Sequence, residues 1–187
     1  AHAHREEQPL PPLKASPQAE PAPVNCQLVF SGSALHQRAK HFVMDQYRLH
    51  FSARLTDFYP SLLCLSQGET ILGVAGLRSA ADNDLFLENY LDCNIETALE
   101  AKLKCAFKRN EIAEVGGLAV VDRTYLAPLF LAVKNHLLEN HYQAGVLTAT
   151  KSIRLALRLA GYATTAIADA SIDPQKSATD WGSYYQH

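Results

Sequence analysis

The sequence has 187 residues, 48% of them hydrophobic and 19% charged, which is typical of one globular domain with a short extension. Its formal net charge of −2 provides no general positive field for nucleic acid or for an anionic membrane surface. No apolar run is long enough for a transmembrane helix, and no apolar leader segment precedes a cleavage site. We therefore expect a cytoplasmic protein that binds no nucleic acid and has no transmembrane segment.

The four cysteines are Cys26, Cys64, Cys93 and Cys105, and no two of them form a Cys-x-x-Cys pair or a spacing typical of a zinc site. We expect no bound metal. Cys64 and Cys105 stand in apolar or helical surroundings, which predicts small core residues in a reducing compartment.

The N-terminal residues 1–25 contain six prolines among alanine, glutamate and glutamine. Such a composition buries too little apolar surface to offset the entropy of ordering, so we expect a disordered tail. Residues 26–187 are then expected to form a single domain.

The first part of the domain is predicted to form a strand, a helix and a β-hairpin. Residues 26–30 are a short apolar run that ends at a Ser-Gly-Ser turn. Ser33 can cap a helix over residues 34–51, where apolar side chains recur at intervals of three and four. Two further apolar runs, residues 61–66 and 70–77, are separated by Gln-Gly-Glu, which is short enough for a hairpin.

The second part alternates predicted helices and strands. The expected helices cover residues 95–109, 126–140 and 150–160, and the expected strands cover residues 112–120, 144–149 and 162–168. Thr150 is a suitable helix cap and Gly161 a suitable helix terminator. This order predicts the α/β (α+β) class, with a mixed central sheet and helices on both faces.

The strand over residues 112–120 carries the principal candidate site. Glu114 lies within an otherwise apolar run, and a buried carboxylate is costly unless it is paired or used in chemistry. Gly116 and Gly117 weaken the strand and are typical of a bulge, or of a close approach by another group. Glu114 is therefore either a general base or a buried structural acceptor paired with a cation such as Arg78. An exposed glutamate beside an ordinary bulge is the other interpretation.

Further polar and aromatic side chains are candidates for ligand binding. Arg78 ends a buried strand, and Glu88 and Asn89 lie in a loop that either grips a ligand or only packs. Lys151, Arg154 and Arg158 share one helix face, which either binds phosphates or an acidic carrier protein, or faces solvent. Thr148 and Thr150 can bond a substrate, although Thr150 equally serves as a cap. Trp181, Tyr184 and Tyr185 either close an acyl pocket or pin the C-terminus.

Several segments resemble known families. The order of elements is similar to the GNAT N-acyltransferase fold, and the Glu114 strand resembles the central strand of the related acyl-homoserine-lactone synthases. From about residue 28 to 187 the chain resembles the thermostable hemolysin family. The segments that carry this resemblance are Phe58-Tyr59-Pro60-Ser61, Leu85-Phe86-Leu87-Glu88-Asn89-Tyr90, Glu114-Val115-Gly116-Gly117-Leu118, Leu147-Thr148-Ala149-Thr150-Lys151 and Trp181-Gly182-Ser183-Tyr184-Tyr185.

The fold resemblance implies an acyl transfer in which an amine attacks a thioester of coenzyme A or of an acyl carrier protein. Glu114 would accept the proton of the amine. The donor would bind to the backbone of the bulge and to cations, and the residues implied are Gly116, Gly117, Leu118, Ala119, Val120, Arg123, Lys151 and Arg154. The substrate side would be lined by Arg78, Glu88, Asn89, Thr148, Thr150, Trp181 and Tyr184.

Two departures limit what the resemblance implies. The pyrophosphate loop of GNAT enzymes has spaced glycines, whereas Arg123 is followed here by Thr-Tyr-Leu-Ala-Pro. The lactone synthases have an arginine where this chain has Gly117, so lactone synthesis is not predicted. The alternatives to an enzyme are a membrane-active hemolysin, for which no inserting segment is visible, and a non-catalytic module that binds an acyl group or a partner.

Overall fold

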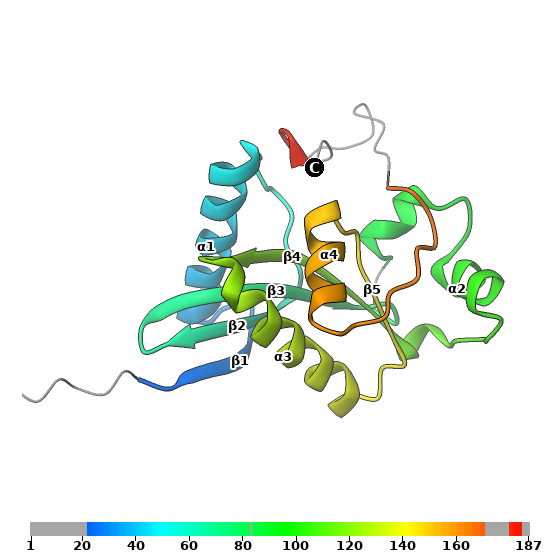
Figure 1. Ribbon diagram of the computed structural model, residues 1–187, viewed down its shortest axis with the longest axis horizontal. Helices are drawn as coiled ribbons and strands as arrows, with labels where there is room; N and C mark the ends of the chain where they lie inside the picture. The colour runs from blue at the N-terminus through cyan, green and yellow to red at the C-terminus, as the bar shows by residue number, and fades with distance from the viewer. Residues whose placement is uncertain (1–21, 83, 171–179, 185–187) are drawn as a thin grey trace, which may run out of the picture.

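A computed structural model describes residues 22–82, 84–170 and 180–184 of the chain. These residues form one sheet with helices on both sides (Figure 1). The strands are β1 (Val24–Phe30), β2 (Ser61–Gln67), β3 (Thr70–Ser79), β4 (Ile112–Val120) and β5 (Ala144–Val146). They lie in the order in which they occur in the chain, and only β4 and β5 are parallel. The predicted fold class is confirmed.

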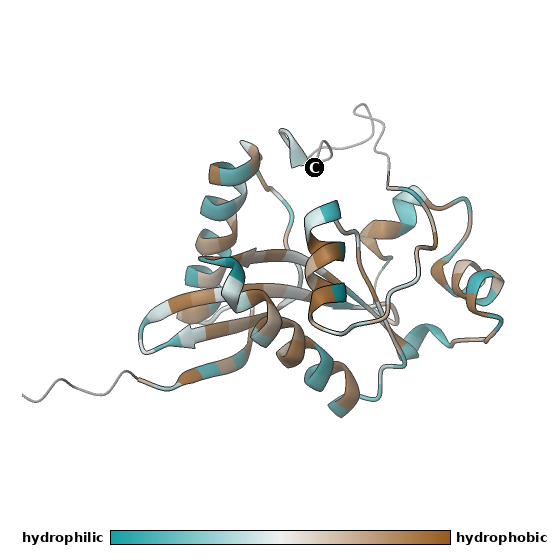
Figure 2. Cartoon of the chain, viewed as in Figure 1, coloured by the Kyte–Doolittle hydropathy of each residue, from teal (hydrophilic) through white to brown (hydrophobic). Residues whose placement is uncertain are grey.

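The two faces of the sheet are covered by different helices. On one face α1 (Ala34–Phe51) packs Ala39 and Val43 against Cys64 and Val74. On the other face α3 (Leu126–Glu139) connects β4 to β5 and places Leu129 and Val133 against Leu63 and Ala75. Side chains therefore alternate between the two cores along each strand, because successive residues of a strand point to opposite faces. Figure 2 shows the apolar residues of the strands and helices alternating with polar ones.

A third cluster extends the molecule beside β4 and β5. It contains the short 3₁₀ helix η1 (Phe86–Tyr90) and α2 (Ile95–Leu103), which pack Leu87, Ile95 and Leu99 against Ile112. In Figure 1 these green elements lie at the end of the molecule away from α1. The loop from β3 to β4 is thereby folded back beside the sheet.

Local signals in the sequence act as predicted at several element ends. The Ser33 hydroxyl accepts a hydrogen bond from the backbone N–H of His36 at the start of α1. The Thr150 hydroxyl accepts one from Ile153 at the start of α4 (Lys151–Leu159). Gly161 ends α4 with a φ of 84°, and Gly68 has a φ of 56° in the hairpin loop. These two glycines occupy a conformation that other residues adopt only at a cost.

Other boundaries were predicted wrongly. Residues 162–168 form no strand, because most of their side chains are exposed and the segment has no apolar face to bury. Strand β5 ends at Val146, three residues early, because its pairing with β4 stops there. Helix α2 ends at Leu103, because Lys104 adopts a φ of 57°.

The start of the domain and one predicted core cysteine also differ from expectation. The first strand begins at Val24, within the predicted tail, and residues 1–21 lie outside the described residues. Cys64 is buried as expected, but Cys105 is exposed and is not a core residue, because the chain has left the helix before it.

Candidate functional site

The site begins where β4 leaves β5. The two strands pair only as far as Glu114 and Val146, and the remainder of β4 has no hydrogen-bonded partner on that side among the described residues. On its other side β4 is bulged, since Val74 faces Ala119 while Gly76 faces Gly116. One β3 residue therefore faces two β4 residues, of which Gly117 has a φ of 55°. This is a β-bulge that depends on glycine, as expected from the sequence.

Tyr59 covers the paired glycines Gly76 and Gly116. A Cβ atom added at either glycine would overlap the Tyr59 side chain. The close approach predicted at Gly116 is therefore made by this ring. The Arg78 guanidinium lies over the same ring, 5.2 Å from its centroid, within the range of a cation–π contact.

These groups line a largely apolar pocket, here called the aromatic pocket. Six of the predicted site residues line it: Arg78, Gly116, Gly117, Thr148, Trp181 and Tyr184. The remaining lining residues come from α1, from the segment before β2, from β2 itself and from η1, and they are Val43, Tyr47, Leu55, Asp57, Phe58, Tyr59, Leu62 and Phe86. Residues from both ends of the domain thus meet around one concave surface, which is typical of a ligand site.

The described C-terminal residues close one side of the aromatic pocket. Trp181 lies 5.5 Å from Phe86 and 5.5 Å from Tyr184, measured between ring centroids. Tyr184 stacks on Tyr47 at 5.6 Å, and the backbone N–H of Ser183 donates to the Phe51 carbonyl. Burial raises the pKa of the Tyr184 hydroxyl. The segment is therefore pinned to α1, as one interpretation of it expected, and it also lines the aromatic pocket. Tyr185 lies outside the described residues.

A second, more polar pocket adjoins the first and is here called the polar pocket. Asp57, Arg78 and Phe86 line both pockets, so the two are contiguous. The polar pocket continues past Asp84, Leu85, Glu88, Asn89, Cys93, Asn94 and Arg109. Glu88 and Asn89 were predicted as substrate contacts, and both are therefore at a pocket surface.

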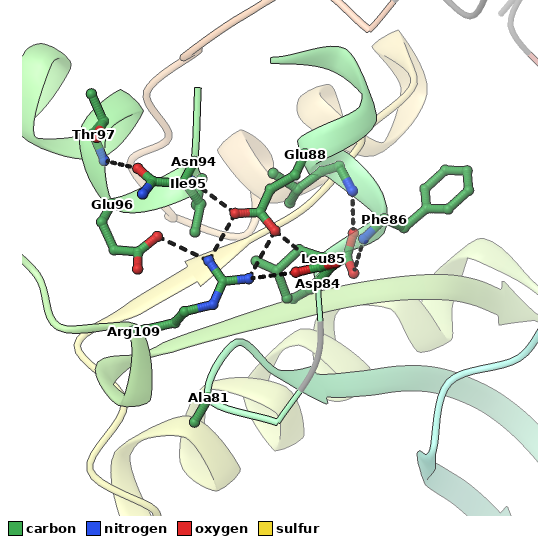
Figure 3. Close-up of polar contacts among 12 residues, drawn as sticks. Ala81, Asp84, Leu85, Phe86, Glu88, Asn94, Ile95, Glu96, Thr97 and Arg109 are labelled. Carbon is green, nitrogen blue, oxygen red and sulfur yellow. Dashed lines mark hydrogen bonds and ion pairs between the residues drawn. The ribbon is translucent and has the colours of Figure 1, made fainter. Parts of the chain in front are cut away.

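Glu88 is held by internal contacts, as Figure 3 shows. Its carboxylate accepts two hydrogen bonds of 2.8 Å from the Arg109 guanidinium, which also donates to Glu96 at 2.9 Å. The backbone N–H groups of Leu85 and Ile95 donate to it at 2.8 and 2.9 Å. The Arg109 contact, with these backbone donors, lowers the pKa of Glu88 to about 2. Glu88 thus ties the start of η1 to the start of α2.

Glu114 has the same kind of role deeper in the protein. Only 1% of its surface is exposed, and it lines neither pocket. One carboxylate oxygen accepts from the backbone N–H of Phe86 at 2.9 Å and the other from Leu87 at 2.8 Å. Burial raises its pKa, and the two amides and the nearby charge of Arg78 oppose that rise. The expected hydrogen-bonded partner, Arg78, is replaced by these two amides. The catalytic role of Glu114 stays a prediction.

The remaining predicted residues lie outside both pockets. Leu118 and Val120 pack on the α3 face, and Ala119 packs on the α1 face. Thr150 is the cap of α4. The three cations are exposed on the elements that follow β4 and β5, and they are Arg123, Lys151 and Arg154.

Sequence reasoning missed the site roles of Tyr59, Asp57 and Phe86. The signal for Tyr59 was the presence of glycines in two neighbouring strands, since a flat sheet surface without side chains accepts an aromatic ring. That signal requires the register that places Gly76 opposite Gly116, and the sequence alone does not provide it. Asp57 and Phe86 lie in irregular segments without periodicity.

The Glu88 contacts generate a prediction for acid unfolding. A depressed carboxyl pKa contributes stability above the ordinary value of about 4.5 and loses it as the pH falls through about 2. Replacing Glu88 by Gln should therefore lower the free energy of unfolding at pH 7, and the deficit should shrink by on the order of 3 kcal/mol towards pH 2. Urea unfolding of both proteins at several pH values, wherever both unfold cooperatively, measures this.

Glu69→Gln is the control for Glu88→Gln, because Glu69 pairs with Arg38 at a side chain that is 93% exposed. It should change stability by less than about 1 kcal/mol at every pH. A Glu88→Gln deficit that stays constant from pH 7 to pH 3 would contradict the depressed pKa.

Glu114→Gln tests the tether to η1. Glutamine keeps one side-chain oxygen and replaces the other by an NH2 donor. One of the two backbone N–H groups, of Phe86 or Leu87, is then left buried without an acceptor. We expect the free energy of unfolding at pH 7 to fall by about 1 to 3 kcal/mol. Glu100→Gln is the matched control, because Glu100 is exposed on α2 and should have almost no effect. Equal stability of the Glu114→Gln variant and the wild type would mean that the tether contributes nothing.

The AHL synthase LasI has a similar fold, with a TM-score of 0.55 over 75% of this chain and 79% of that chain, at 12% sequence identity. FeeM, an N-acyl amino acid synthase from uncultured soil microbes, has a TM-score of 0.51 over 71% of this chain and 76% of that chain, at 17% identity. No curated protein sequence is significantly similar. The family model described as thermostable hemolysin matches residues 29–187, so the chain belongs to the thermostable hemolysin family.

Proposed function

We propose that the protein is an N-acyltransferase that moves an acyl group from a thioester of coenzyme A or of an acyl carrier protein to an amine. The observation that carries this proposal is the glycine bulge of β4, which opens onto the aromatic pocket just beyond the point where β4 leaves β5. The bulge leaves backbone N–H groups outside the ladder, and such groups can polarise a carbonyl. Both structural neighbours are named as synthases, one of AHL and one of N-acyl amino acids.

In the proposed reaction the amine nitrogen attacks the thioester carbonyl. A carbon–nitrogen bond forms, the carbon–sulfur bond breaks, the thiol leaves and the amine gives up a proton. The carbonyl would lie near Gly117 and Thr148, where the pocket meets the bulge of β4 and the segment that follows β5. The acyl chain would lie among the aromatic side chains, because apolar surface is favourably removed from water there.

The donor's phosphates or acidic carrier would lie towards the exposed cations. Lys151 begins α4 three residues after Thr148, which lines the aromatic pocket, and Arg154 is one turn further. Arg123 follows β4 in the same way. A thioester carbonyl in the pocket would therefore be within reach of a chain that passes these cations. Two donor classes fit this arrangement, coenzyme A and an acyl carrier protein.

Glu114 enters this mechanism in one of two ways. As a general base it would have to reach the amine directly or through water, although it is buried and lines neither pocket. As a tether it fixes Phe86, whose side chain lines both pockets. The described contacts support the tether. A transfer rate that falls by roughly 100-fold in Glu114→Gln, at an unchanged melting temperature, would support the base instead.

A membrane-active hemolysin is the competing function. Within the described ranges, no helix combines the length and the apolar character needed to cross a bilayer. The two functions differ in whether an acyl donor is required, and the experiment below includes that comparison.

The function is tested by measuring thiol release and product mass after mixing the protein with acyl-CoA or acyl carrier protein and a panel of amines. We expect donor-dependent formation of an amide with at least one donor class. Dye-loaded lipid vesicles without donor should remain intact in the presence of the protein. Dye release without donor, together with no amide from any pair, would contradict the proposal.

The same assay tests whether the acyl chain binds in the aromatic pocket. Trp181→Ala should reduce transfer from a long-chain donor by about tenfold or more and affect an acetyl donor much less, because the removed ring contacts only the longer chain. Leu159→Ala is the control, since Leu159 is apolar and 79% exposed on α4. An equal loss for both chain lengths would place the acyl chain elsewhere.

A further inference from the structure

We infer that the acceptor is an α-amino acid with a free carboxylate, bound in the polar pocket with its carboxylate on Arg78 and its amine beside Asp57. This inference rests on the proposed acyl transfer and specifies its acceptor class. The charges of the polar pocket differ in how far the protein itself neutralises them.

Arg109 is fully engaged. Its guanidinium donates to Glu88 and Glu96, and it approaches Asp84 at 3.8 Å. These contacts raise the pKa of Arg109, which marks a cation stabilised in place by its partners. Figure 3 shows its guanidinium surrounded by the three acidic side chains. Arg109 and Glu88 therefore form a wall of the polar pocket, and other residues have to recognise the charges of a ligand there.

Arg78 is in the opposite situation. It is half-buried and lines both pockets, and within the described part of the chain it donates one hydrogen bond, to the Asp84 carbonyl at 3.3 Å. Arg78 is paired with Glu114 in the β3–β4 register, but that carboxylate is occupied by the amides of Phe86 and Leu87. Among the described residues Arg78 thus has no ion-pair partner. A half-buried guanidinium with most of its donors free is suited to an incoming anion.

The chemistry around Arg78 selects the anion. Asp57 and Asp84 line the same pocket and are exposed, so a doubly charged phosphate would meet two repelling carboxylates and one cation. A carboxylate has one negative charge and the planar shape that matches a guanidinium fork. The ligand charge that fits best is therefore a single carboxylate.

Asp57 supplies the complementary charge. One of its carboxylate oxygens accepts from the backbone N–H of Phe58, and the other has no partner in the described part of the chain. Asp57 and Arg78 line both pockets, and within the described residues they form no ion pair with each other. A group with a carboxylate and an amine on one carbon matches an arginine and an aspartate placed in this way.

The position of these two residues also suits the reaction. They mark the boundary between the aromatic pocket and the polar pocket. An amine held at this boundary faces an acyl group whose chain lies in the aromatic pocket. The amine then forms the carbon–nitrogen bond, the thiol leaves with the carbon–sulfur electron pair, and the amine proton passes to the thiolate or to water.

The experiment compares amino acids with their amino alcohols, which keep the amine and the side chain and lack the carboxylate. Binding is measured by ligand-observed NMR without donor, and transfer is measured with acyl-CoA and acyl carrier protein. We expect amino acids to bind and react better than the matched amino alcohols. Arg78→Gln should weaken amino-acid binding by roughly 10-fold to 100-fold and change amino-alcohol binding by less than about threefold, since charged hydrogen bonds contribute about 1.5 to 3 kcal/mol.

Arg48→Gln is the control, because Arg48 is exposed on α1, lines neither pocket and pairs with the neighbouring Asp45. It should leave both ligand classes unchanged. The comparison of the two ligand classes on the wild-type protein needs no variant, so it remains decisive if Arg78→Gln unfolds.

The outcomes separate this inference from the proposed function. Acyl transfer to amino alcohols as fast as to amino acids would overturn the inference and leave acyl transfer standing. Binding of amino acids that depends on Arg78, without turnover from any donor, would support the site and overturn the enzymatic proposal. Absence of any preference for the carboxylate, in binding and in transfer, would overturn the inference outright.

Discussion

The arrangement depends on one buried carboxylate and the two backbone amides that it accepts. Removing Glu114 from water raises the free energy of its ionised form, and burial accordingly raises its pKa. The amides of Phe86 and Leu87 offset part of this cost, because hydrogen bonds to an ionised acceptor are stronger than neutral ones. The result is a fixed connection between the middle of β4 and a loop that would otherwise have few anchors.

Both pockets follow from this connection. Phe86 carries one of the two amides, and its ring lines the aromatic pocket beside Trp181 and the polar pocket beside Arg78. Glu88, two residues later, extends the same loop to Arg109 and α2. Thus one carboxylate from β4 and one from η1 hold the backbone of this loop, and the Phe86 side chain of the loop lines both pockets. Glu88 and Glu114 thus accept backbone amides that position the residues around the two pockets.

The aromatic pocket is assembled from segments that are distant in the sequence. Tyr59 precedes β2, and its ring lies on glycines of β3 and β4. Trp181 and Tyr184 come from the end of the described chain and pack on α1. Because every wall belongs to a different element, the pocket exists only in the folded domain. The guanidinium of Arg78, which has no ion-pair partner among the described residues, lies where these walls meet the polar pocket.

The sequence predicted the elements with strong periodicity and their caps. It also identified the strand with Glu114 and its glycine pair, because a carboxylate and two glycines stand out in an apolar run. It did not identify the partners of those residues. One interpretation of Glu114 paired it with a cation such as Arg78, and its carboxylate accepts two loop amides, while the close approach expected at the glycine pair is made at Gly116 by Tyr59. Contacts of this kind depend on how irregular segments return to the sheet, which local patterns do not encode.

Irregular structure explains the wrong boundaries as well. Residues 162–168 include tyrosine, threonine and isoleucine, which favour a strand, but most of their side chains are exposed. Propensity alone therefore favoured an element that packing does not stabilise.

Amide hydrogen exchange at Phe86 and Leu87 tests the tether most directly. If the Glu114 carboxylate holds both N–H groups, these two amides should exchange as slowly as those of the core of β4, although they begin a short 3₁₀ helix. The amide of Asp84, in the exposed part of the same loop, should exchange rapidly. Rapid exchange at both Phe86 and Leu87, at the rate of Asp84, would contradict the account.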